Sequence, residues 1–120
     1  MSSARHADPF RGRIRPQVAE RIRGYVELQG ELQPLVDRLR RDCTELASDS
    51  EAAGALDDLS SLSQLLESTH VLPHVRFDLS LARGLDYYTG LIYEVVLEGA
   101  QVGSIAAGGR YALTRVWSLM

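Results

Sequence analysis

The spacing of the apolar residues changes once along the chain, and this change constrains the fold more than any other feature. Between positions 16 and 74 the apolar residues recur every three to four positions, as on one face of a helix. From Val75 to Leu81 they alternate with polar residues, as in a strand with one covered face. The sequence therefore predicts an α+β fold, with helices first and an antiparallel sheet after them.

Three amphipathic helices are predicted in the first part. One begins at Pro16, which suits an opening turn, and ends at Gly30. The next has Pro34 in its opening turn, and the last begins near Asp49 and ends before Pro73. Their apolar faces consist of Val18, Ile22, Tyr25 and Val26, of Leu32, Leu35, Val36, Leu39, Cys43 and Leu46, and of Leu56, Leu59, Leu62, Leu65 and Leu66. We expect the three faces to be buried against one another.

A meander of three strands is predicted in the second part, at 75–81, 91–97 and 102–107. The segment 91–97 is apolar on both faces except at Glu94, which predicts an interior strand. If the strand from Val75 continued in register, Arg83 would project on the same side as Phe77 and Leu81. An unpaired guanidinium there is costly, so a bound anion or carboxylate is expected to compensate it.

Composition fits one globular domain and excludes several classes of protein. The chain has 120 residues, of which 45% are hydrophobic and 24% charged. Its apolar runs are shorter than the roughly 18 to 20 residues that cross a bilayer, and no signal peptide is recognised, so we expect an intracellular protein without a membrane partner. The single Cys43 fits a reducing compartment. Because His6, His70 and His74 are scattered, no metal site is predicted.

Residues 1–15 are polar and rich in arginine, which predicts a flexible basic lead-in. Arg21 and Arg23 continue this basic character, although the formal net charge of the chain is -3. The simpler explanation is a solvated tail. A nucleic-acid contact or an organelle-targeting peptide is the alternative.

Two glycine-containing segments, Arg83–Gly90 and Gly103–Tyr111, carry the candidate site residues. Arg83 presents a planar set of donors that matches a carboxylate or phosphate in a two-point contact. An ordinary ion pair with Asp78, Asp86 or Glu94 is the alternative.

Tyr87 and Tyr88 are adjacent, so in an extended segment their side chains point to opposite sides and only one easily faces a given pocket. A loop at Gly84 or Gly90 would relax this limit. A tyrosine hydroxyl both donates and accepts, which suits recognition of an imidazole nitrogen. The alternative is that these residues are half-buried strand aromatics.

Gly108 and Gly109 allow close backbone approach or a positive φ, and they place Arg110 and Tyr111 at a strand end. A plain turn is the alternative explanation of this glycine pair.

The two segments, in this order and spacing, resemble the signature segments of histidyl-tRNA synthetases, which are class II aminoacyl-tRNA ligases. The resemblance runs from about Pro16 to Tyr111. It implies that 16–74 belongs to a helical insertion region that reaches over the tRNA acceptor stem, and that 75–111 is a fragment of the antiparallel class II catalytic sheet. Ala112 stands where the family has aspartate, so 112–120 is expected to be a divergent tail.

The resemblance also implies roles for the candidate residues. Arg83 would act in catalysis, contacting the histidine carboxylate and the α-phosphate of the adenylate. Tyr87, Tyr88 and Tyr111 would line the pocket for the histidine side chain. The pocket backbone would include Gly84, Gly108 and Gly109.

The substrates implied are histidine, ATP with magnesium, and tRNA(His), with no bound prosthetic group. The family forms homodimers, but the class II dimerisation motif has no match in this chain, and neither do the ATP-binding arginine motif or the anticodon-binding domain. We therefore expect the 120 residues alone not to charge tRNA. The alternative function is a non-catalytic synthetase-like module that binds histidine, tRNA or a full-length synthetase. The expected location is the cytoplasm, with the mitochondrion as the alternative.

Overall fold

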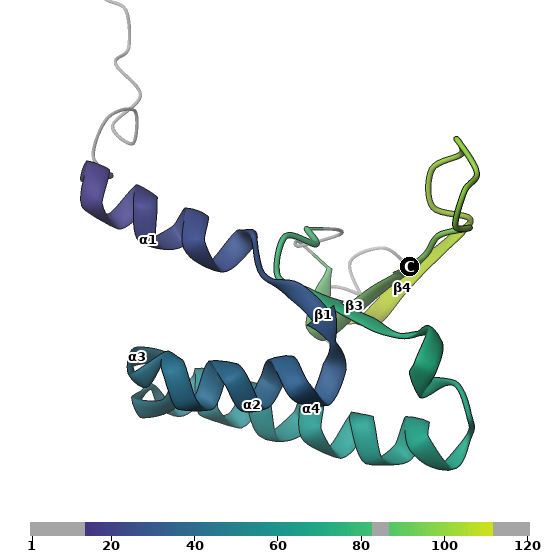
Figure 1. The fold of residues 1–120 in the computed structure, drawn as a ribbon, viewed down its shortest axis with the longest axis horizontal. Helices are drawn as coiled ribbons and strands as arrows, with labels where there is room; N and C mark the ends of the chain where they lie inside the picture. The colour runs from purple at the N-terminus through teal and green to yellow at the C-terminus, as the bar shows by residue number, and fades with distance from the viewer. Residues whose placement is uncertain (1–13, 83–86, 112–120) are drawn as a thin grey trace, which may run out of the picture.

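The computed structural model describes residues 14–82 and 87–111 and confirms the α+β class (Figure 1). Residues 1–13 of the expected lead-in, the expected tail at 112–120, and the candidates Arg83 and Gly84 lie outside the described residues. The elements, in chain order, are α1 (Pro16–Val26), β1 (Gln29–Glu31), α2 (Leu32–Asp42), α3 (Thr44–Ser48), α4 (Ser50–Ser68), the 3₁₀ helix η1 (Leu72–His74), β2 (Arg76–Asp78), β3 (Tyr88–Val95) and β4 (Ala106–Tyr111).

The core lies between α2 and α4, which run side by side (Figure 1). It consists of Leu32, Leu35, Val36 and Leu39 of α2 together with Leu56 of α4. Partly buried residues that follow α4, namely Leu72, Val75, Phe77 and Leu79, pack against the same cluster. The apolar faces predicted for the second and third helices therefore form the core, except that Leu65 of the third face is exposed.

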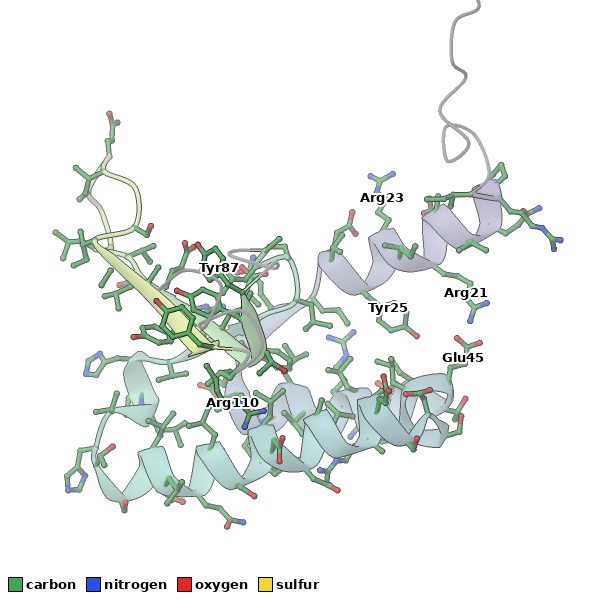
Figure 2. All side chains as sticks on the ribbon, turned by 180° about the vertical axis from the view of Figure 1, so that it is seen from behind. Arg21, Arg23, Tyr25, Glu45, Tyr87 and Arg110 are labelled. Atoms are coloured by element: carbon green, nitrogen blue, oxygen red, sulfur yellow. The ribbon has the colours of Figure 1, made fainter. Side chains whose placement is uncertain are left out.

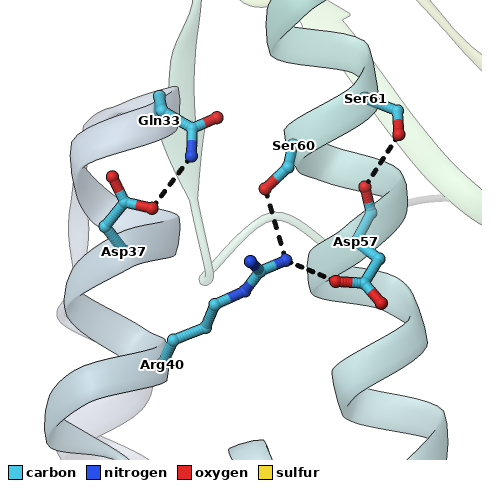
Figure 3. A network of polar contacts seen from close by, with 6 residues as sticks. All are labelled: Gln33, Asp37, Arg40, Asp57, Ser60 and Ser61. Carbon is cyan, nitrogen blue, oxygen red and sulfur yellow. Dashed lines mark hydrogen bonds and ion pairs between the residues drawn. The ribbon is translucent and has the colours of Figure 1, made fainter.

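Polar contacts also connect α2 and α4. The Arg40 guanidinium donates to the Asp57 carboxylate at 2.6 Å and to the Ser60 hydroxyl at 3.3 Å (Figure 3). The predicted start of α4 at Asp49 is confirmed, because its carboxylate accepts a hydrogen bond from the Ala52 amide at 2.8 Å. The Arg40 and Asp57 side chains are both exposed, so their ion pair adds about 0–1 kcal/mol to the stability of the fold.

The helix predicted over Leu32–Leu46 is interrupted. Cys43 has φ -112° and ψ 72°, outside the helical region, so α2 ends before it and α3 begins after it. Both Cys43 and Leu46 still pack against the core. The apolar spacing is therefore preserved across the break, which is why the periodicity did not reveal it.

The first predicted helix is confirmed as α1, but the predicted burial is wrong for most of its apolar face. α1 extends away from the α2–α4 pair (Figure 1), and none of its residues is buried. Val18, Ile22 and Val26 are exposed. Arg21 forms an exposed ion pair with Glu45 of α3 (Figure 2). Tyr25, the remaining residue of the predicted face, is partly buried and packs against the core, so α1 contributes one side chain to the edge of the core.

The predicted three-stranded meander is also wrong, because the strands form two separate two-stranded antiparallel sheets. β1 pairs with β2, and Gly30, predicted to end a helix, lies within β1 opposite Phe77. β2 ends at Asp78, whose carboxylate accepts from the Ser80 amide at 2.8 Å and the Ser80 hydroxyl at 2.6 Å. The chain turns there, so the strand does not continue in register to Arg83.

β3 and β4 pair with each other and form the second sheet, which we call the ribbon. The prediction of an interior strand at 91–97 is wrong, since among the described strands β3 pairs only with β4, and Leu91, Tyr93 and Val95 are exposed. The last strand begins at Ala106 rather than at position 102. Over 14–82 and 87–111, no helix is long and apolar enough to cross a membrane.

Truncation of the core is expected to destabilise the chain. Leu39 is 1% exposed, so Leu39→Ala should lower the free energy of unfolding by about 2–5 kcal/mol in a denaturant titration. The control is Leu65→Ala on α4, which removes the same atoms from a side chain that is 67% exposed and should change stability by about 0.5 kcal/mol or less. Equal effects of the two substitutions would contradict the assigned core.

Candidate functional site

The ribbon carries most of the candidate residues that the structure describes. Tyr88 opens β3, with Tyr87 in the turn immediately before it. Gly108, Gly109 and Tyr111 all lie in β4. The candidates Arg83 and Gly84, together with Asp86, lie outside the described residues, so the ion-pair alternative for Arg83 has no geometry here.

The three candidate tyrosines come together in one tyrosine cluster (Tyr87, Tyr88 and Tyr111). The ring centroids of Tyr87 and Tyr88 are 4.7 Å apart in an edge-to-face contact. Tyr88 stacks on Tyr111 with 5.2 Å between centroids, and Tyr87 lies 6.1 Å from Tyr111. These distances are those of interacting aromatic pairs. Two segments more than twenty positions apart in the sequence therefore contribute to one aromatic surface.

A bulge in β3 explains how both adjacent tyrosines reach Tyr111. Tyr88 pairs with Tyr111 and Ile92 pairs with Gly109, so residues 89–91 of β3 face only Arg110 of β4. Gly90, within this bulge, has φ +74°, a value that glycine adopts without strain. Strand alternation would send the side chains of Tyr87 and Tyr88 to opposite faces. Tyr87 lies in the turn before β3, so this rule does not apply to the pair. Gly84, the other glycine considered, lies outside the described residues.

Gly108 and Gly109 are required for close approach and not for a turn. A Cβ on Gly109 would lie 2.8 Å from Cγ of Tyr88 and 2.9 Å from the backbone oxygen of Leu91. A Cβ on Gly108 would lie 2.7 Å from the Tyr93 hydroxyl oxygen. Within 14–82 and 87–111, the glycines with positive φ are Gly90 and Gly99. Each glycine of the pair thus lies beneath a tyrosine ring inside β4, and the plain-turn explanation is wrong.

The two faces of the ribbon differ in chemistry. Side chains alternate along β4, so Gly109 and Tyr111 belong to the face with the tyrosine cluster, while Gly108 and Arg110 belong to the other face with Tyr93. In Figure 2, Tyr87 and Arg110 extend from opposite sides of the ribbon. Sequence reasoning assigned no role to Tyr93 or Arg110, because their contacts depend on the strand register.

The environment of the cluster raises the pKa of the Tyr88 phenol. Partial burial of the ring is the largest cause, since it disfavours the phenolate. Next come the charge that Tyr111 would carry when ionised and the hydrogen bond to its hydroxyl, followed by smaller contributions from Tyr87 and Tyr93. Tyr88 therefore stays neutral to a higher pH than an ordinary tyrosine, in the form that both donates and accepts hydrogen bonds.

The cluster offers aromatic faces together with phenol hydroxyl groups. Such a surface suits a small planar ring with polar nitrogens, because the ring can stack while the hydroxyls hydrogen-bond to its edge. Over 14–82 and 87–111, no group of three histidine, cysteine or acidic residues is arranged to hold a metal ion.

Filling the space at Gly109 should disrupt the cluster. Gly109→Ala places a methyl group against the Tyr88 ring and the Leu91 carbonyl, and is expected to cost about 1–3 kcal/mol of stability and reduce the tyrosine near-ultraviolet circular dichroism. The control is Gly103→Ala, whose Cβ would meet no atom within 4 Å and which should leave both quantities unchanged. A full tyrosine signal in Gly109→Ala would contradict the assigned contact.

The raised pKa predicts a loss of stability at alkaline pH. A phenol with a higher pKa in the folded chain stabilises folding fully below the ordinary value of 10.0, and this contribution is lost as the pH rises through the folded pKa. Tyr111→Phe should lower the Tyr88 pKa, because it removes the hydrogen bond and the neighbouring charge. Phenolate absorbance during a pH titration measures this, with Tyr25→Phe as the control. A titration curve of Tyr88 that Tyr111→Phe leaves in place would rule out the coupling.

Comparison with known proteins connects this geometry to a family. The family model described as histidyl-tRNA synthetase matches residues 7–117. The expectation that the likeness is confined to about Pro16–Tyr111 is therefore wrong, because the match extends beyond both of these residues.

Similar relatives are histidine–tRNA ligases. The cytoplasmic ligase of Dictyostelium discoideum is 51% identical over 96 residues, that of Arabidopsis thaliana 45% over 95, and the mitochondrial ligase of Homo sapiens 42% over 116. These alignments cover 78%, 79% and 89% of this chain, but only 20%, 11% and 22% of the respective relatives. The chain, which spans about a tenth to about a fifth of the length of these relatives, belongs to the histidyl-tRNA synthetase family.

Proposed function

We propose that residues 75–111 form part of the histidine-binding side of a histidine–tRNA ligase catalytic domain. The observation that carries this proposal is the tyrosine cluster, in which Tyr87, Tyr88 and Tyr111 approach within 4.7–6.1 Å between ring centroids. An imidazole ring stacked on this surface meets phenol hydroxyls that accept from one nitrogen and donate to the other. Hydroxyls buried with a ligand also reject analogues that lack the matching polar group.

Arg83 is proposed as the residue that holds the charged part of the substrate. It lies four residues before Tyr87 in the sequence. Its guanidinium is suited to a two-point contact with the histidine carboxylate and to the α-phosphate of histidyl-adenylate, where negative charge develops during activation. In this proposal ATP with magnesium is the second substrate, and the backbone at Gly84, Gly108 and Gly109 shapes the pocket.

Residues 16–74 are proposed as the helical insertion region, close to the acceptor stem of tRNA(His). Support comes from the exposed position of α1, which projects from the helical pair and carries Arg21 and Arg23 (Figure 2). Both guanidinium groups are exposed and form ion pairs, Arg21 with Glu45 and Arg23 with Glu27, so phosphate groups of the tRNA would replace these carboxylates as partners. Since the relatives include cytoplasmic and mitochondrial ligases, we place the protein in one of these two compartments.

A non-catalytic module that docks on a full-length synthetase is the second candidate. The observation that favours it is the ribbon, in which β3 and β4 pair only with each other among the described strands and Leu91 and Val95 are exposed. Exposed strand edges and apolar side chains are typical surfaces for further pairing. Histidine binding by this chain supports the first candidate, whereas association with a full-length synthetase in the absence of histidine binding supports the second.

The proposal predicts stabilisation by ligand. A non-hydrolysable histidyl-adenylate analogue at 100 times its Kd should stabilise the folded chain by about 2.7 kcal/mol, seen as a higher Tm in a thermal unfolding scan. Tyr111→Phe should reduce this shift because it removes a hydroxyl, and Arg83→Ala should abolish it. Tyr25→Phe, on α1, is the control that should keep the full shift. A cooperative transition that does not respond to the analogue would refute histidine binding by this chain.

A further inference from the structure

The Arg110 side chain covers Gly90 across the ribbon. A Cβ on Gly90 would lie 2.9 Å from Nη2 of Arg110, 3.4 Å from its Cζ and 3.6 Å from its Nε. The planar guanidinium therefore occupies the space into which any other residue at position 90 would direct its side chain. This contact joins the two strands at the position of the β3 bulge.

The bulge needs an interaction of this kind. Residues 89–91 face only Arg110 of β4, so regular ladder hydrogen bonds do not fix their conformation. Gly90 itself has the broadest conformational freedom of any residue type. The bulge also sets the direction of the backbone at Tyr87 and Tyr88. The rings of these two residues must reach Tyr111.

We propose that Arg110 is a positioning residue: its guanidinium covers Gly90 on the face opposite the tyrosine cluster and holds the β3 bulge in the conformation that brings Tyr87 and Tyr88 against Tyr111. Strand alternation places Arg110 on the face away from these rings, so it supports the cluster from behind and does not contact the bound histidine. The relevance to histidine rests on the proposed function, whereas the effect on the tyrosine rings is measurable without ligand.

Substitution of Arg110 in the 120-residue chain tests this role. Arg110→Ala is expected to reduce the tyrosine near-ultraviolet circular dichroism and to weaken binding of the histidyl-adenylate analogue roughly tenfold, while the far-ultraviolet helix signal stays unchanged because α2 and α4 form the core elsewhere. Arg110→Lys keeps the charge but lacks the planar group, so it should not restore the tyrosine signal. Full rescue by lysine would overturn the proposal that planar cover is the function of this side chain.

Gly90→Ala tests the same contact from the other strand. The new Cβ displaces the guanidinium, and the strain of alanine at φ +74° is present with or without Arg110. In a double-mutant cycle, Arg110→Ala should therefore change the tyrosine signal much less in the Gly90→Ala background than in the wild type. Additive effects of the two substitutions would contradict a shared role.

The outcomes also separate this inference from the proposed function. If the wild type fails to bind the analogue while Arg110→Ala still disrupts the tyrosine signal, the proposed function fails and Arg110 remains a positioning residue for the cluster. If the wild type binds and Arg110→Ala leaves both the tyrosine signal and the affinity unchanged, the role of Arg110 is refuted and histidine binding stands.

Discussion

Burial of one face of α2 against α4 is the interaction on which the described structure depends. Val36 and Leu39 are almost completely removed from solvent, and the residues that lead from α4 through η1 and β2 pack on the same cluster. Apolar burial is the main favourable term in folding, so this cluster anchors the chain immediately before the candidate site. α1, by contrast, adds an exposed helix with basic side chains and contributes little to the core.

The candidate site itself depends on three glycines, which have no side chain. Gly108 and Gly109 let two tyrosine rings lie directly on β4, and Gly90 permits the bulge that directs Tyr87 and Tyr88 toward Tyr111. Tyr88, Gly109 and Tyr111 lie on paired strands, which limits the movement of the stacked rings. The α+β fold, with short antiparallel sheets, is consistent with part of a class II synthetase.

Sequence reasoning succeeded where a local signal determines the structure. The carboxylate of Asp49 begins α4, the leucine spacing defines the α2–α4 core, and the motif residues Tyr87, Tyr88 and Tyr111 do meet. It failed where distant segments decide the outcome. Pairing of Gly30 with Phe77, the break at Cys43 and the exposure of α1 all depend on partners that apolar spacing does not identify. The same limit hid Arg110, whose contact with Gly90 follows from the strand register.

Histidine binding by the tyrosine cluster is tested most simply by titrating histidine into the chain with its tyrosine rings labelled for nuclear magnetic resonance. The sequence has 5 tyrosines, and Tyr25 on α1 and Tyr93 on the opposite face of the ribbon serve as internal controls. If histidine binds to the tyrosine cluster, the ring signals of Tyr87, Tyr88 and Tyr111 shift with a common affinity while those of Tyr25 and Tyr93 do not. Unchanged signals for the tyrosine cluster, or equal shifts at all positions, would contradict a histidine site on this face.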